Sequence, residues 1–205
     1  PILMANSGTT LAEGFLGLGL GIALAFVTAV LMDRYRFLYK SLYPILVITQ
    51  TIPTVAIAPL LVLWMGYDMA PKIALVVIVC FFPMAVGLLD GFRSADQDTV
   101  NLLRSMGASK GQIFRMVKLP SSLGRFFSSL RVSVSYSIVG AVIAEWLGGN
   151  SGLGVYMTRV RKSYAFDKMF AVIVLISLIS LLLMWLVSMI QRLCMPYEKY
   201  GGNQS

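Results

Sequence analysis

The segment DQDTVNLLRSMGASKGQIFRMVKLP (Asp96–Pro120) decides the fold, because it is a charged, amphipathic stretch between runs too apolar for a soluble protein. Of the 205 residues, 58% are hydrophobic and 13% are charged, and the mean hydropathy is +0.80. A soluble domain carries about 25% charged residues, so about half of the solvating charge is missing. The composition therefore predicts a protein that crosses a membrane several times and keeps this segment outside the lipid.

Composition also excludes several kinds of site. The net charge is +8, but lysines and arginines that flank membrane spans give the same excess, so we expect no nucleic-acid partner. The chain has no histidine, which excludes imidazole metal ligands, serine–histidine nucleophiles and histidine proton relays. Cys80 and Cys194 lack the spacing of a disulfide framework or a zinc site. We expect neither a metal site nor a catalytic residue.

Five stretches are apolar and long enough to cross the membrane, since a spanning helix needs about 20 apolar residues. They are Leu11–Met32, Leu42–Met65, Lys72–Phe92, Phe126–Leu147 and Met169–Leu193. Backbone polar groups in lipid must be paired within each span, which favours helices. The predicted fold is an all-α polytopic transmembrane bundle. It forms one domain over residues 1–205, with the bundle at about 11–193 and a cytoplasmic hairpin at 94–120.

The basic residues predict the orientation of this bundle. One side carries Arg34, Arg36, Lys40, Arg93, Arg104, Lys110, Arg115, Lys118, Arg125, Arg131, Arg192 and Lys199. The other side carries only Lys72, Arg159, Arg161, Lys162 and Lys168. Because cytoplasmic loops are enriched in Lys and Arg, the hairpin and the C-terminus are predicted to be cytoplasmic. Pro1 then lies outside, and we expect the complete protein to have a sixth span upstream.

Two predicted spans carry a periodic face. On the first, Gly17, Gly21, Ala25 and Ala29 recur at four-residue spacing, which is typical of close helix packing. On the fourth, the same spacing holds Ser129, Ser133, Ser137, Ala141 and Glu145. The serines either pack against a helix, with their hydroxyls bonded to the preceding turn, or line a polar pathway. Glu145 either faces water or protein inside the bundle, or lies at the membrane interface.

The second predicted span contains Pro44, Pro53 and Pro59. Proline removes an intrahelical hydrogen bond and kinks a helix, and broken helices often line transport cavities. On one interpretation Pro53 and Pro59 therefore belong to a broken, pathway-lining segment. On the other, Pro44 starts the helix and the remaining two prolines are ordinary kinks.

Within Asp96–Pro120 the sequence predicts two short helices. Ser94 followed by Gln97, with two aspartates in the first turn, is typical of a capped helix start. Gly107 is then expected to end the first helix in the left-handed conformation. Ser109 and Gln112 repeat the capping pattern and begin a second helix, which is expected to end at Leu119-Pro120.

The second of these helices has an apolar stripe of Ile113, Phe114 and Val117 opposite basic side chains. An amphipathic helix that lies on anionic lipid is one interpretation. Two capped helices around a tight glycine turn favour the other, a projection that docks in the groove of a partner protein, with Ile113 and Phe114 as apolar anchors.

These residues resemble the signature loop of bacterial ABC importer permeases, in which Glu-Ala-Ala is followed at fixed spacing by Gly, Ile and Leu-Pro. Gly107, Val117, Leu119 and Pro120 fall at those spacings. The Glu-Ala-Ala positions instead hold Asn101-Leu102-Leu103, so the family's acidic contact is absent. The segments QTIPTVAIAPLLVLWMG (Gln50–Gly66), FFPMAVGLLDGFR (Phe81–Arg93) and GAVIAEWLGGNSGLG (Gly140–Gly154) are similar to the nitrate, taurine, sulfonate and pyrimidine-precursor branch.

The resemblance implies that the hairpin is a coupling segment bound by a separate ATPase subunit, which would hold the ATP and Mg. This chain would then need no cofactor and would not hydrolyse ATP. Two permease copies and an extracellular or lipoprotein solute-binding protein would complete the assembly in the bacterial cell membrane. The coupling residues implied are Asn101, Leu102, Leu103, Gly107, Ala108, Ser109, Ile113, Phe114, Val117, Leu119 and Pro120.

The sequence segments of this chain are most similar to those of permeases for thiamine-precursor pyrimidines or related vitamins. Permeases for sulfonate, taurine or nitrate are the alternative, and Arg159, Arg161 and Lys162 would suit an anion funnel or an acidic lobe of the binding protein. An alternative function of a different class is a channel or carrier that needs no ATPase. The stretch Gly148–Gly154 lacks the Gly-Lys-Ser/Thr ending of a phosphate loop and is expected to form a flexible outer turn.

Overall fold

The computed structural model describes residues 2–195, whose regular elements are all helices. In chain order these are α1 (Ile2–Arg34), α2 (Arg36–Thr49), α3 (Thr54–Met65), α4 (Met69–Arg93), α5 (Gln97–Ser105), α6 (Lys110–Ile113), a π-helical turn (Phe114–Lys118), α7 (Leu119–Leu147), α8 (Leu153–Lys162) and α9 (Phe166–Cys194). Two residues used to predict orientation, Pro1 and Lys199, lie outside the described part.

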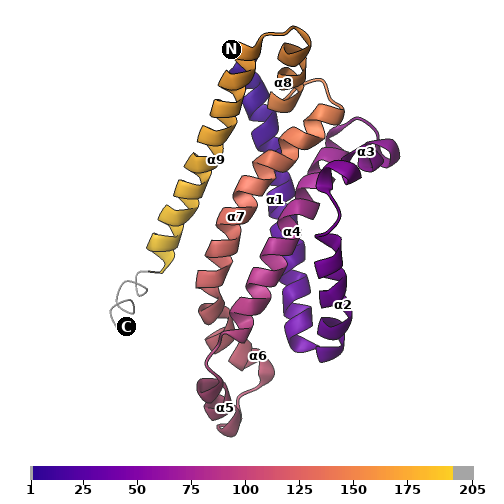
Figure 1. The fold of residues 1–205 in the computed structure, drawn as a ribbon. Helices are drawn as coiled ribbons and strands as arrows, with labels where there is room; N and C mark the ends of the chain where they lie inside the picture. The colour runs from indigo at the N-terminus through magenta and orange to yellow at the C-terminus, as the bar shows by residue number, and fades with distance from the viewer. Residues whose placement is uncertain (1, 196–205) are drawn as a thin grey trace.

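Helices α1, α4, α7 and α9 extend along the long axis of the molecule, and each is long and apolar enough to cross a membrane. Figure 1 shows α5, α6 and the α1–α2 turn at one end, with α3, α8 and the start of α1 at the other. The all-α bundle is thus confirmed. The first span begins well before the predicted Leu11, and the fourth begins before Phe126, because the polar residues at these ends continue the helices.

The centre of the bundle is the contact of α1, α4 and α7, where small residues let the helices approach closely. Ala25 and Ala29 are fully buried. A Cβ atom added at Gly17 would collide with the side chain of Val76 on α4, and one at Gly21 would lie 3.3 Å from Cβ of Cys80. The small-residue face predicted on the first span is therefore confirmed as a helix-packing surface.

Replacing Gly17 with alanine is expected to destabilise the bundle, although alanine favours a helix by about 1 kcal/mol over glycine. Overpacking against Val76 costs about 1–3 kcal/mol, which outweighs that gain. Gly19, on the same helix, has open space around its Cα, so Gly19→Ala should keep the gain and raise stability. Thermal unfolding of the two variants in detergent measures the difference, and equal midpoints would contradict the packing argument.

The second predicted span is broken. Helices α2 and α3 meet at an angle of 98° across residues 50–53. The α-helical hydrogen-bond pattern stops here for two reasons. The backbone N–H groups bond the carbonyl only three residues back at Gln50, Thr51 and Ile52. Pro53, just before α3, has no N–H to donate. The predicted break is confirmed, and a pathway role for this segment stays a prediction. The alternative that Pro44 starts the helix is wrong, since Pro44 lies inside α2, and Pro59 lies inside α3.

Candidate functional site

The hairpin at the α5–α6 end begins with a side-chain cap. Asp96 is the N-cap of α5, and its carboxylate accepts hydrogen bonds from the backbone N–H of Asp98 at 3.2 Å and of Thr99 at 3.1 Å. The Thr99 hydroxyl donates a further bond to it at 2.6 Å. The predicted cap at Ser94 is wrong, because Ser94 ends α4 and donates its hydroxyl to the carbonyl of Gly91.

The same bonds make the cap sensitive to pH. The Thr99 hydroxyl, followed by the two backbone N–H groups, lowers the pKa of Asp96 below its usual value of 3.8. A carboxyl with a lowered folded-state pKa stabilises the fold above the unfolded pKa and loses that effect as the pH falls through the folded value. We expect hydrogen-exchange protection at the start of α5 to fall below about pH 4. Asp96→Asn should abolish this dependence while keeping a cap.

Gly107 forms the turn between the two helices. Its φ is +85°, a left-handed conformation that favours glycine, and the Ala108 N–H donates to the Leu103 carbonyl at 2.9 Å. Ser109 and Gln112 then form a reciprocal capping box, with bonds of 3.3 and 2.8 Å. Both sequence predictions are confirmed, and the hairpin is a fixed shape rather than a loose loop.

Leu119-Pro120 was expected to end the second helix, and this is wrong. The chain passes from α6 through the π-helical turn Phe114–Lys118 directly into α7. Proline is tolerated in the first turn of a helix, where its missing N–H costs nothing, so Pro120 allows the helix to continue. The second helix of the hairpin and the long transmembrane helix are consequently one continuous element.

The apolar stripe of the hairpin faces inward. Ile113 is 5% exposed and packs with Ala95 and Val100, and Val117 borders the same cluster. Phe114 makes an edge-to-face contact with Phe92 of α4 at 5.0 Å between ring centres. Of the predicted anchors, Ile113 therefore joins the two hairpin helices and Phe114 holds the hairpin to the bundle, and neither is presented to a partner in this structure.

The outer surface of the hairpin carries a different set of apolar side chains, Leu102, Met106 and Met116, which are 61%, 73% and 64% exposed. The coupling residues predicted from the sequence include Leu102 but neither methionine, because no helical stripe links Met106 and Met116. Leu102 and Met106 lie just before the Gly107 turn and Met116 lies in the π-helical turn that follows α6, while Asn101 and Ser109 are also exposed. Exposed apolar side chains at the tip of a capped projection are typical of a docking surface.

The hairpin is fixed to the bundle by charge as well as by packing. Lys118 bonds both carboxylate oxygens of Asp33 on α1, at 2.6 and 2.8 Å, in a half-buried position. Arg93 at the end of α4 stacks 3.7 Å from the ring centre of Tyr39 on α2. A displacement of the hairpin would therefore move several transmembrane helices with it.

A buried polar network lies at the opposite end of the bundle, and the sequence predicted only one member of it. The Lys72 ammonium on α4 bonds the Glu13 carboxylate on α1 at 2.6 Å, and both side chains are almost fully buried. Glu145 on α7 is 2% exposed and interacts with both of them. It accepts hydrogen bonds from the Thr10 hydroxyl at 2.6 Å and from the Gly154 N–H. Glu145 thus faces protein and is not interfacial.

The same network holds the turn at residues 148–154. The Gly152 N–H donates to the Asn6 side chain at 2.8 Å, and the Leu153 N–H donates to the Thr10 hydroxyl at 2.9 Å. Gly152 has a φ of +125°, and a Cβ atom there would collide with the Glu145 carboxylate. The prediction of a flexible turn is wrong, because α1 and α7 tie it down from both sides.

The predicted serine stripe lies in the contact between α4 and α7. The Ser129 side chain sits against Gly87, and the Ser133 hydroxyl donates to the Cys80 carbonyl at 3.4 Å. The Ser137 hydroxyl donates to the Val134 carbonyl one turn earlier. This arrangement matches the packing interpretation, and a pathway role for these serines stays a prediction.

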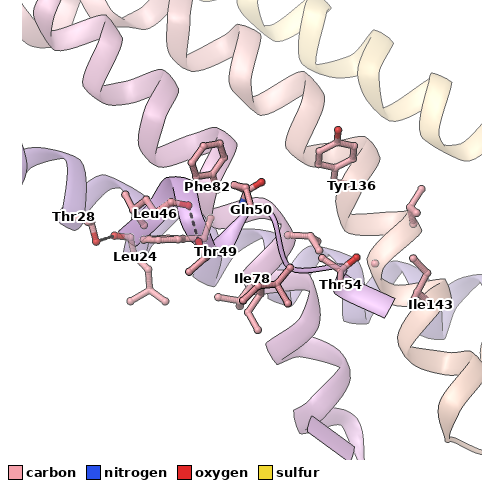
Figure 2. A pocket seen from close by; sticks show the side chains of 16 residues that line it. Leu24, Thr28, Leu46, Thr49, Gln50, Thr54, Ile78, Phe82, Tyr136 and Ile143 are labelled. Carbon is pink, nitrogen blue, oxygen red and sulfur yellow. Dashed lines mark hydrogen bonds between the residues drawn. The ribbon is translucent and has the colours of Figure 1, made fainter. Parts of the chain in front are cut away.

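A cavity of about 610 Å³ opens where α2 breaks from α3 (Figure 2). It is bounded by α1, α2, α3, α4 and α7, with Thr49, Gln50 and Thr54 at the break and Tyr136 and Ile143 on α7. The candidate pathway residues Pro53 and Pro59 do not line it, although Pro53 lies between lining residues Ile52 and Thr54. Such a volume is typical of small-molecule sites.

Comparison with known proteins agrees with this arrangement. Residues 17–194 match the family described as binding-protein-dependent transport system inner membrane component. The chain is 36% identical over 190 residues to the formylaminopyrimidine transport permease protein ThiX of Halalkalibacterium halodurans, covering 93% of this chain and 76% of that protein. It is 30% identical over 193 residues to the putative aliphatic sulfonates transport permease protein SsuC of Bacillus subtilis, covering 93% and 68%. Its fold is similar to a chain of the MetNI methionine ABC transporter in an inward-facing conformation, with a TM-score of 0.80 at 20% identity over 93% and 95% of the two chains.

Proposed function

Because this chain belongs to the family of binding-protein-dependent transport system inner membrane components, we propose that it moves a neutral pyrimidine solute inward, driven by an ATPase bound at its hairpin. The chain is a multi-pass membrane protein and the permease subunit of an ABC importer. The solute, the separate ATPase and the assembly around the permease are the parts that we propose.

The hairpin is the observation that carries the ATPase part of this proposal. It is a capped projection that exposes Leu102, Met106 and Met116, while Lys118 at its base is bonded to Asp33 of the bundle. A short helix with an exposed apolar tip suits a groove in a partner protein. ATP-driven movement of such a partner would carry the hairpin and the helices attached to it.

The departure at Asn101-Leu102-Leu103 changes the chemistry that we expect at this contact. Where the family motif has an acidic residue, this chain presents an exposed amide at Asn101 and an exposed Leu102, while Leu103 is half-buried. We propose that apolar burial of Leu102 replaces the missing charge contact. The ATPase groove opposite Leu102 would then be apolar rather than basic.

The remaining partners follow from the same assignment. Two copies of this chain would form the pathway, two ATPase subunits holding ATP and Mg would bind the hairpins, and an extracellular solute-binding protein would dock at the α3–α8 end. That end carries Arg159, Arg161 and Lys162 on α8, which suit an acidic lobe of such a protein. The membrane would be the bacterial inner membrane, with the hairpin cytoplasmic.

The substrate class rests on similarity to ThiX, a formylaminopyrimidine permease. A sulfonate is the alternative, supported by the lower similarity to SsuC. The test is uptake into vesicles that contain the complete transporter with its own ATPase and binding protein. ATP-dependent uptake of formylaminopyrimidine, without uptake of taurine, is expected. Taurine uptake instead would favour the sulfonate alternative, and uptake with an inactive ATPase would indicate a channel or carrier.

A further inference from the structure

The break between α2 and α3 lies where the membrane is expected to be. The 14 residues of α2 rise about 21 Å at 1.5 Å per residue, which is less than the hydrocarbon thickness of about 30 Å. No side chain caps the first turn of α3, and the Ala56 N–H bonds back only three residues, to the Pro53 carbonyl at 2.9 Å. Unpaired backbone groups at membrane depth are tolerated only inside protein or beside a polar-filled cavity.

The cavity of about 610 Å³ lies at this break, and its lining has a distinct chemistry. Among the described residues that line it, none is charged, while Phe81, Phe82 and Tyr136 supply aromatic surface. An anion such as a sulfonate would lose its hydration there without a cationic side chain to compensate, which is costly. The lining therefore favours an uncharged, flat solute.

Three polar side chains in the cavity remain available for a ligand. The Thr28 and Thr49 hydroxyls donate to the carbonyls of Leu24 and Leu46, at 2.8 and 2.7 Å, so their protons are already used. Within residues 2–195, the Gln50 amide and the hydroxyls of Thr54 and Tyr136 bond no other residue. Figure 2 shows Gln50 at the α2–α3 break and Tyr136 on α7. An amide and a hydroxyl can bond the ring nitrogens and exocyclic groups of a heterocycle.

We propose that this cavity binds the transported solute, a neutral aromatic heterocycle, through stacking on its aromatic wall and hydrogen bonds from Gln50 and Tyr136. The proposal rests on the proposed function and adds the place and the selecting residues within this chain. Exclusion of sulfonates follows from the uncharged lining, so selection would occur in the permease as well as in the binding protein.

A matched pair of substitutions on α7 tests the cavity. Val139 lines it and is 46% exposed, whereas Val132, two turns earlier on the same face, is 44% exposed and does not line it. In the complete transporter, Val139→Trp is expected to reduce ATP-dependent uptake of formylaminopyrimidine by at least about tenfold, since the indole fills the space that the solute needs. Val132→Trp should leave uptake unchanged. Co-purification with the ATPase shows whether each variant assembles.

A conservative change covers the case in which Val139→Trp does not assemble. Tyr136→Phe removes only one hydroxyl, and loss of one neutral hydrogen bond should raise the KM for uptake by about two- to tenfold. An unchanged KM in this variant, or uptake by Val139→Trp equal to wild type as expected if a lipid tail fills the cavity, would overturn the cavity assignment. Equal loss of uptake in both tryptophan variants would overturn it as well.

The same measurements separate this proposal from the proposed function. Uptake of formylaminopyrimidine by the wild-type transporter supports the proposed function, regardless of the uptake measured for the cavity variants. Wild-type transporter that takes up taurine and no pyrimidine would overturn both the substrate class and the neutral-ligand cavity.

Discussion

Replacing Gly107 with valine is expected to abolish ATP-driven uptake while the permease still inserts and folds. The left-handed conformation at this residue, with a φ of +85°, costs a non-glycine residue about 1–2 kcal/mol and is least suited to a β-branched one. There is open space around Gly107, so the effect comes from the backbone and not from a clash. A cost of that size lowers the population of the native turn by about 5–30-fold. The exposed side chains around the turn would no longer share one docking geometry.

Gly111 provides the control for this substitution. It lies four residues further on, in the first turn of α6, and it too has open space around its Cα, but its φ is not positive. Gly111→Val should therefore retain uptake. The measurements are uptake into vesicles and ATP hydrolysis by the same complexes. Normal uptake by Gly107→Val at wild-type expression would contradict the role assigned to the turn.

Replacing Lys72 with methionine is expected to produce the largest loss of stability in this chain. Lys72 neutralises Glu13 at 2.6 Å and also interacts with Glu145, and these three side chains are nearly inaccessible. Removing one partner of a buried ion pair leaves an uncompensated charge and costs about 3–5 kcal/mol. Here two carboxylates would be left together. We expect low yield and a marked drop in the thermal unfolding midpoint in detergent.

A double-mutant cycle tests whether the pair itself is responsible. Lys72→Met with Glu13→Gln removes both charges, so the double variant should be more stable than Lys72→Met alone. Lys40→Met removes an exposed lysine at the other end of the bundle and should change little. If the double variant were as unstable as Lys72→Met, the loss would arise from packing and not from the stranded carboxylate.

Local patterns in the sequence predicted the hairpin well. The capping box of Ser109 and Gln112 and the stop at Gly107 depend on neighbours within a few residues, so spacing alone indicates them. The helix starting at Asp96 was misplaced by two residues because Ser94 and Asp96 are both good caps and only the end of α4 decides between them. Pro120 was misread since proline both ends helices and begins them.

Contacts between distant segments could not be predicted in the same way. Glu13 and Lys72 are 59 residues apart and lie on different helices, and no periodicity relates them. The inward orientation of Phe114 likewise depends on α4, which supplies Phe92. The cavity arises from a 98° bend whose existence the prolines favoured, but whose walls come from five helices.

The uninterrupted helical path from Lys110 to Leu147 has a mechanical consequence. Its 38 residues reach about 57 Å, from the hairpin end of the bundle past Glu145 to the opposite end. A continuous helix of that length couples its two ends, so a displacement of the hairpin would be passed to the end that holds Glu145. The π-helical turn is the one departure from regular α-helical winding between Lys110 and Leu147, and bending along this path is expected there.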